Sequence, residues 1–156
     1  MAAATVGGMD RLPPELGLSM DCADAPALAR FWCRALDYVE APPPHGWSDW
    51  PSFLRDHEVP EAEWADGATI RPRTGAGPSI SLLRVPEAKT VKNRLHLDVR
   101  VSGGRHVEQS LREQRIRATE ADLVAHGARR QREDRVDGHL DHLVMEDPEG
   151  NEFCIV

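Results

Sequence analysis

The sequence is short of several kinds of residue, and each shortage excludes a class of protein. Only three of the 156 residues are cysteine and none lies in a CxxC pair, so we expect no disulfide framework and a reducing compartment. Lys and Arg number 19 against 26 Asp and Glu, and the net charge of −7 lacks the basic excess that binding to nucleic-acid phosphates requires. No run approaches the roughly 20 apolar residues of a membrane span, and no signal-peptide pattern is present. The sequence therefore predicts a soluble cytoplasmic protein that binds neither nucleic acid nor membrane.

A chain of 156 residues fits one domain with a single hydrophobic core. Residues 1–14 are rich in Ala and Gly, so we predict a flexible tail followed by a single domain at 15–156. Prolines punctuate residues 41–66, which we interpret as an insertion with short helices starting near Asp49 and Pro60. Its aromatic side chains form either a local mini-core or a lid over a ligand. These aromatic residues are Trp47, Trp50, Phe53 and Trp64.

The first half of the domain follows the order strand, helix, hairpin. Residues 16–22 are short and apolar, as in a buried strand. Asp24 stands where a helix N-cap is expected, and apolar residues recur at helical spacing up to about Asp37. A hairpin then runs from Asp66 through a Gly/Pro turn to a second strand at 79–85.

The second half repeats this order. Residues 94–101 alternate strictly between apolar and polar and form the clearest strand of the sequence. A charged helix is predicted over 106–126, with its Glu and Arg residues on a solvated face, and a hairpin over 137–156. The predicted apolar stripe of this helix consists of Val107, Leu111, Ala118, Ala121 and Ala125. We interpret the repetition as an internal duplication, with module one at 15–88 and module two at 93–156.

Three segments resemble the glyoxalase-like proteins of the vicinal oxygen chelate superfamily, which includes glyoxalases, bleomycin resistance proteins and dioxygenases. They are residues 16–32 (LGLSMDCADAPALARFW), 94–101 (RLHLDVRV) and, most specifically, 147–156 (DPEGNEFCIV). The resemblance implies an α+β fold of paired βαβββ modules that form a curved mixed sheet around a concave pocket. It also implies a small-molecule ligand and a homodimer.

The metal-dependent members of this superfamily bind a divalent ion through four side chains, usually His, Gln or Glu, from equivalent strands of the two modules. The resemblance places these positions on Leu18, Ser81, His96 and Cys154. Only His96 is a strong metal ligand, although Glu152 lies on the same strand face as Cys154. We therefore expect a degenerate metal site and no cofactor, with a divalent metal at His96 as the alternative.

Several side chains carry alternatives that the sequence leaves open. His96 is either a hydrogen-bonded polar residue of the pocket or a ligand or proton-transfer group. Cys154 is either a small buried apolar residue or, beside a cation such as Arg94 or Arg100, a thiolate. His142 could join His96 and Glu152 in a depleted site.

Two functions are consistent with these residues. The first is a binding protein of the bleomycin-resistance type, which sequesters a small metabolite or antibiotic in a concave cleft. The second is a lyase or isomerase that uses His96 and Glu152 for acid/base chemistry. A pocket whose function has lapsed, leaving an interaction module, is a third option. The predicted ligand-binding residues are Leu18, Met20, Ser81, Asp98, Arg100 and Cys154.

Overall fold

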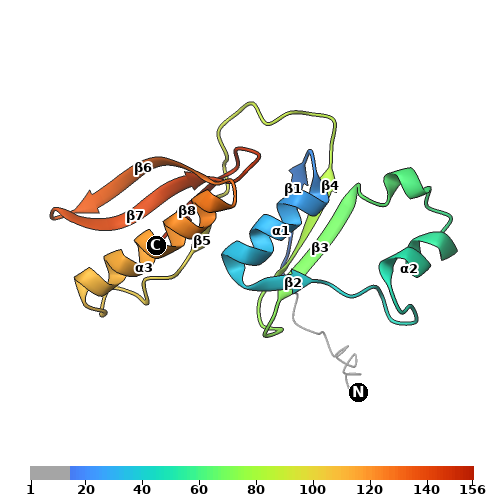
Figure 1. The fold of residues 1–156 in the computed structure, drawn as a ribbon, viewed down its shortest axis with the longest axis horizontal. Helices are drawn as coiled ribbons and strands as arrows, with labels where there is room; N and C mark the ends of the chain where they lie inside the picture. The colour runs from blue at the N-terminus through green and yellow to red at the C-terminus, as the bar shows by residue number, and fades with distance from the viewer. Residues whose placement is uncertain (1–14) are drawn as a thin grey trace, which may run out of the picture.

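The computed structural model describes residues 15–156, so the tail predicted at 1–14 lies outside the described residues. Two mixed four-stranded sheets dominate the fold, in the orders β1-β4-β3-β2 and β5-β8-β7-β6 (Figure 1). The strands of the first sheet are β1 (Gly17–Cys22), β2 (Tyr38–Glu40), β3 (Gly67–Pro72) and β4 (Ser79–Arg84). Those of the second are β5 (Leu97–Val99), β6 (Arg129–Val136), β7 (His139–Glu146) and β8 (Glu152–Ile155).

Each sheet packs against one long helix. These helices are α1 (Ala25–Leu36) and α3 (Gln109–Ala125), while the shorter α2 (Trp50–Asp56) and the 3-10 turn η1 (Glu61–Glu63) belong to the insertion. In both sheets the first strand pairs in parallel with the fourth, and the remaining pairs are antiparallel. The two modules therefore have the same topology, which confirms the predicted α+β fold of paired βαβββ units. No helix within residues 15–156 is both long and apolar enough to cross a lipid bilayer.

Helix α1 forms as its sequence predicts. The side chain of Asp24 accepts a hydrogen bond from the backbone N–H of Ala27 at 2.9 Å, which satisfies one of the free donors at the helix start. The helix ends where Asp37 adopts a left-handed φ of 53°. Its buried face carries Phe31 and Trp32, whose rings meet Phe153 of β8 edge-on at centroid distances of 5.9 and 5.3 Å. Helix α1 thus joins the cores of the two modules.

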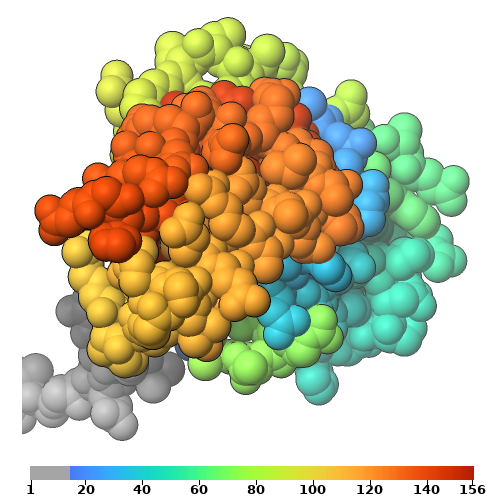
Figure 2. Space-filling view, turned by 60° about the vertical axis from the view of Figure 1, so that its left-hand side comes forward, coloured from blue at the N-terminus to red at the C-terminus, as the bar shows by residue number. Residues whose placement is uncertain are grey.

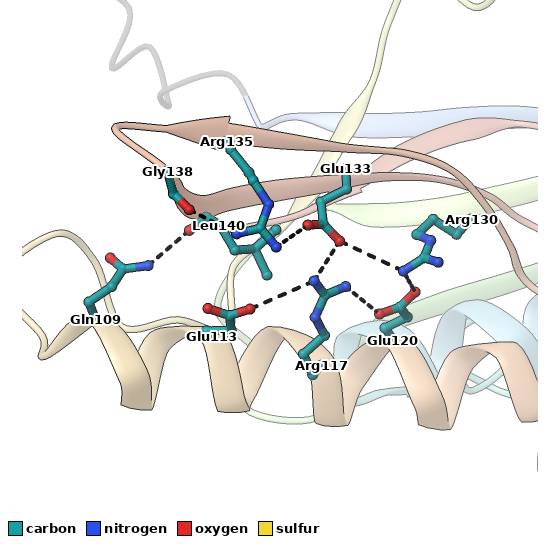
Figure 3. A network of polar contacts seen from close by, with 9 residues as sticks. All are labelled: Gln109, Glu113, Arg117, Glu120, Arg130, Glu133, Arg135, Gly138 and Leu140. Carbon is teal, nitrogen blue, oxygen red and sulfur yellow. Dashed lines mark hydrogen bonds and ion pairs between the residues drawn. The ribbon is translucent and has the colours of Figure 1, made fainter.

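Helix α3 packs differently from the prediction, and the predicted apolar stripe is wrong. The buried residues of α3 are Ile116 and Leu123, whereas Leu111 is 38% exposed. Charged side chains take part in docking the helix on the sheet. Arg117 bonds to Glu120 of its own helix at 3.1 Å and to Glu133 of β6 at 2.5 Å (Figure 3). The Arg and Glu residues are therefore not simply a solvated face but also connect α3 to β6.

Three strands depart from the sequence prediction. Strand β5 covers only Leu97–Val99 rather than 94–101, because its pairing with β8 begins at Leu97, opposite Phe153. Leu95, an apolar residue of the alternating segment 94–101, precedes the strand and is 68% exposed. Strand β6 was missed because it is an edge strand with an Arg-rich, mostly exposed sequence, and β2 was missed because it has three residues.

The insertion, which contains α2, lies at the outer edge of the first sheet (Figure 1), and its aromatic side chains form a small cluster of their own. Trp47 and Trp50 both meet Phe53 edge-on, at ring-centroid distances of 5.0 and 5.5 Å. Each indole N–H finds an acceptor nearby: Trp47 donates to Asp56, Trp50 to the carbonyl of Ala41, and Trp64 to the carbonyl of Val59. These contacts support the local mini-core over the lid.

Candidate functional site

A cavity of about 780 Å³ lies between the two modules. Its apolar wall comes from β1, from α1 and from the start of β5. The residues of this wall include Leu18, Met20, Trp32, Leu95 and Leu97. The polypeptide between β4 and β5, residues 85–93, forms a second wall and is called the connector below. It arches between the modules in Figure 1 and forms the top of the molecule in Figure 2.

Only some of the residues predicted for ligand binding and catalysis line this cavity. Leu18, Met20 and Glu152 line it, whereas Ser81 does not. Leu18 and Met20 pack partly against the core and also line the cavity, as does Ser19 between them. Ser81, the register partner of Ser19 on β4, does not line it.

The remaining predicted residues lie elsewhere on the second module. Asp98 and Cys154 are register partners on β5 and β8 and do not line the cavity. Arg100 lines a separate, more open cavity of about 590 Å³ beside α1 and α3, and its guanidinium lies 3.8 Å from Asp98. The structure thus does not bring Asp98, Arg100 and Cys154 to the same cavity as Leu18.

A cluster of polar groups marks the point where the connector meets β8. The Lys92 ammonium donates to Oε2 of Glu152, and Nε2 of His96 lies 3.3 Å from the same oxygen. Glu152 is only 8% exposed, and its backbone N–H donates to Oδ1 of Asn93 at 3.3 Å. The hydrogen bond from Lys92 lowers the pKa of Glu152, outweighing the opposing effect of desolvation. Glu152 is therefore held as a carboxylate beside His96, which itself does not line the cavity.

The positions that the sequence resemblance assigns to metal ligands offer few donor atoms. Leu18 offers no donor atom, and Ser81 is a weak one. Within residues 15–156 no group of three or more His, Cys, Asp or Glu side chains is arranged to hold a metal. His142 does not supplement the pair of His96 and Glu152, because its ring nitrogens each lie 3.0 Å from other carboxylates. These partners are Asp134 and Asp141.

Neither Cys22 nor Cys154 is set up as a nucleophile. Burial raises the pKa of the Cys22 thiol to about 11, helped by nearby carboxylates of which Glu149 has the largest effect. Desolvation also raises the pKa of Cys154, and the Coulombic effect of Asp98 adds to it, although Arg132 acts in the opposite direction. The effect of Arg132 is therefore smaller than the effects that raise the pKa, and Cys154 is not stabilised as a thiolate.

The turn between β7 and β8 contributes contacts that the sequence did not predict. Glu149 accepts hydrogen bonds from the backbone N–H groups of Ala23 and Asp24 at 2.7 and 2.9 Å, just before α1. Asp147 is fully buried and accepts a hydrogen bond from the indole N–H of Trp32 at 3.2 Å. The turn motif itself was recognisable, but its partners lie more than 100 residues away in sequence. Module two thus fixes the side of module one that faces the cavity.

The fold defines the class of this protein: two βαβββ modules with a cavity lined by residues of both. Comparison with known proteins identifies the family. The family model for a glyoxalase-like domain matches residues 17–156. The chain therefore belongs to the glyoxalase-like domain family, which confirms the resemblance seen in the sequence. Comparison with curated protein sequences gives no significant match.

Solved structures share the fold at low sequence identity. A glyoxalase/bleomycin resistance protein/dioxygenase family enzyme from Burkholderia phytofirmans is 14% identical, with a TM-score of 0.54 over 88% of this chain and 93% of that one. The fosfomycin resistance protein FosX from Listeria monocytogenes, complexed with Mn(II) and 1S,2S-dihydroxypropylphosphonic acid, is 11% identical, with a TM-score of 0.55 over 97% and 90%. A possible glyoxalase from Bacillus cereus is 12% identical, with a TM-score of 0.53 over 92% and 97%.

Proposed function

We propose that this protein binds a small molecule in the cavity between its modules and acts as a sequestering protein of the bleomycin-resistance type. The observation that carries the proposal is the cavity itself, whose volume of about 780 Å³ suits a drug-sized ligand. Its wall of Leu18, Met20 and Leu97 would bury the apolar part of such a ligand, and charged residues of the connector would contact its polar part.

The proposed binding needs no metal. The crystallised complex of FosX contains Mn(II), whereas the resemblance assigns the first ligand position of this chain to Leu18. The residues assigned to the ligand positions, of which only His96 is a strong ligand, support a degenerate metal site. Purified protein is expected to carry no stoichiometric divalent ion, which elemental analysis of untagged protein would check. Stoichiometric metal at His96 would contradict this part of the proposal.

A cavity-filling variant tests the binding site. Leu18→Trp places an indole in the cavity, and Leu83→Trp makes the same change at a β4 position that is 45% exposed and does not line the cavity. We expect calorimetric titration to show that bleomycin or fosfomycin, or the fluorescent probe anilinonaphthalene sulfonate, binds the wild type and Leu83→Trp alike. Leu18→Trp should weaken that binding at least about tenfold, a loss of roughly 1.4 kcal/mol. Equal affinity of a folded Leu18→Trp variant would contradict the proposed site.

A lyase or isomerase is the second candidate, favoured by the contact of His96 with Glu152 at 3.3 Å. A carboxylate that orients an imidazole is a common arrangement for proton transfer. Against it, the lowered pKa of Glu152 makes this group a weak base at neutral pH. Chelator-resistant isomerisation of small α-hydroxycarbonyl compounds that is lost in His96→Ala would favour the enzyme over the binding protein.

We also propose a cytoplasmic homodimer. The three free cysteines support a reducing compartment. The resemblance to glyoxalase-like proteins implies a partner chain, which would cover the open side of the cleft between the modules. Light scattering of dilute protein should give about twice the chain mass of 17.3 kDa, and a monomer mass would contradict the dimer.

A further inference from the structure

The connector forms almost an entire wall of the cavity. Eight of its nine residues, all but Pro86, line the cavity. Most of it is nevertheless exposed to solvent, and the side chain of Val91 is 73% exposed. A segment that separates a cavity from solvent while packing on little else is suited to move.

Hydrogen bonds hold the connector at its two ends. At the first end, the backbone N–H of Val85 donates to the carbonyl of Cys22 in β1 at 2.9 Å. At the second, Asn93 accepts from the backbone of Glu152 and Lys92 donates to the Glu152 carboxylate. Between these ends, the one hydrogen bond of residues 86–91 that the described part of the chain contains runs from Lys89 to the carbonyl of Val91, within the connector. Within residues 15–156, the middle of the connector therefore has no hydrogen bond to either module.

We infer that residues 86–93 are a gate over the ligand cavity and that the ion pair of Lys92 with Glu152 is its latch. This inference rests on the proposed ligand-binding function. Glu152 is the fixed half of the latch, because it belongs to β8 and its side chain is 8% exposed. Lys92 is the mobile half, because its side chain is 56% exposed.

His96 lowers the cost of opening the gate. When Lys92 leaves, the Glu152 carboxylate would lose a charged partner in a nearly buried position, which is unfavourable. Nε2 of His96 already lies 3.3 Å from the same oxygen and can donate to it. His96 therefore acts as a positioning residue that satisfies Glu152 while the gate is open.

Two alanine variants of the connector separate the latch from a general effect of charge. Lys92→Ala removes the latch, whereas Lys89→Ala removes the same charge from the same wall and breaks only a hydrogen bond within the connector, not a contact to Glu152. Backbone amide order parameters from nuclear magnetic resonance should fall at Ala88 and Thr90 to below about 0.6 in Lys92→Ala. They should remain as in the wild type in Lys89→Ala. Equal order parameters in the two variants would overturn the latch.

Stopped-flow kinetics with anilinonaphthalene sulfonate test whether the gate controls entry. The dissociation rate should rise about fivefold in Lys92→Ala relative to Lys89→Ala, as expected for loss of one ion pair whose Lys92 half is exposed to water. Lys92→Arg, which keeps the pair, should restore the wild-type rate. Equal dissociation rates in the two alanine variants would overturn the gate. If the wild type does not bind the probe, or if Leu18→Trp does not weaken binding, the proposed function is wrong, and so is a gate over a ligand. The order parameters still show in that case whether Lys92 holds the connector.

Discussion

Replacing the buried carboxylate of Asp147 by an amide should destabilise the protein strongly. Asp147 is fully buried and accepts four hydrogen bonds, from the indole of Trp32, the backbone of Glu149, and the backbone and side chain of Asn151. Two of these donors converge on each carboxylate oxygen. In Asp147→Asn, whichever way the amide is turned, an NH₂ group faces two N–H donors. The substitution therefore loses two hydrogen bonds and places donors against each other.

The expected cost is about 3 kcal/mol, because a hydrogen bond to a charged acceptor contributes roughly 1.5–3 kcal/mol and partial relaxation offsets part of the loss. For a chain of this size the melting temperature should fall by about 6–12 °C. Urea unfolding followed by circular dichroism measures the change in free energy directly. Asp137→Asn is the control, since it makes the same chemical change at an exposed turn residue with a φ of 50°, which Asn tolerates. An Asp147→Asn variant within about 0.5 kcal/mol of the wild type would refute the reasoning.

The same residue gives a pH dependence with a definite sign. Desolvation raises the pKa of Asp147 above its usual 3.8, although the surrounding donors oppose the shift. The folded protein therefore binds this proton more tightly than the unfolded chain does. The resulting stability is fully present below the unfolded pKa and is lost as the pH rises through the folded pKa. The free-energy difference between wild type and Asp147→Asn should thus be larger at pH 4 than at pH 7, and an equal or reversed difference would contradict a raised pKa.

Three further predictions concern other parts of the molecule. Cys22, with a pKa of about 11 and 4% exposure, should react with iodoacetamide at pH 8 at least about 100-fold more slowly in the folded protein than in urea, by peptide mass spectrometry; equal rates would contradict its burial. Ile116→Ala should cost about 2–5 kcal/mol in urea unfolding and Leu111→Ala less than about 1, because only the former is buried; the reverse order would restore the stripe predicted from the sequence. Arg117→Ala should lower the urea midpoint, and the loss should shrink in 1 M NaCl if the contacts to Glu133 and Glu120 act as ion pairs; a salt-independent loss would assign the effect to packing.

The parts of the fold that the sequence predicted are those set by local signals. Asp24 caps α1 through a contact three residues away, and the hairpin turns carry their own Gly and Pro residues. The parts that it missed depend on distant partners. Strand β6 is stabilised by its pairing with β7 and by Arg117 of α3, neither of which appears in its own polar sequence.

The same distinction applies to the candidate site. Leu18, Met20 and Glu152 were predicted as binding or catalytic residues, and all three line the cavity. The connector was not predicted to contribute, because no periodicity or motif marks a polar loop as the wall of a cavity. The partner of Lys92 lies in module two and that of Glu149 in module one. Both are distant in sequence, and only the three-dimensional structure brings them together.

The position of the insertion has a practical consequence for experiments on this protein. Its segment leaves the first sheet at β2 and returns at β3, while the cavity is lined by β1 at the opposite edge of that sheet. The three indole N–H groups of the aromatic cluster donate to acceptors within residues 41–59, and none of these acceptors lines the cavity. An affinity peptide or a fluorophore inserted into the exposed turns of residues 57–63 would therefore lie away from the cavity. Such a graft offers a way to immobilise the protein on a sensor surface while its pocket stays open to solution.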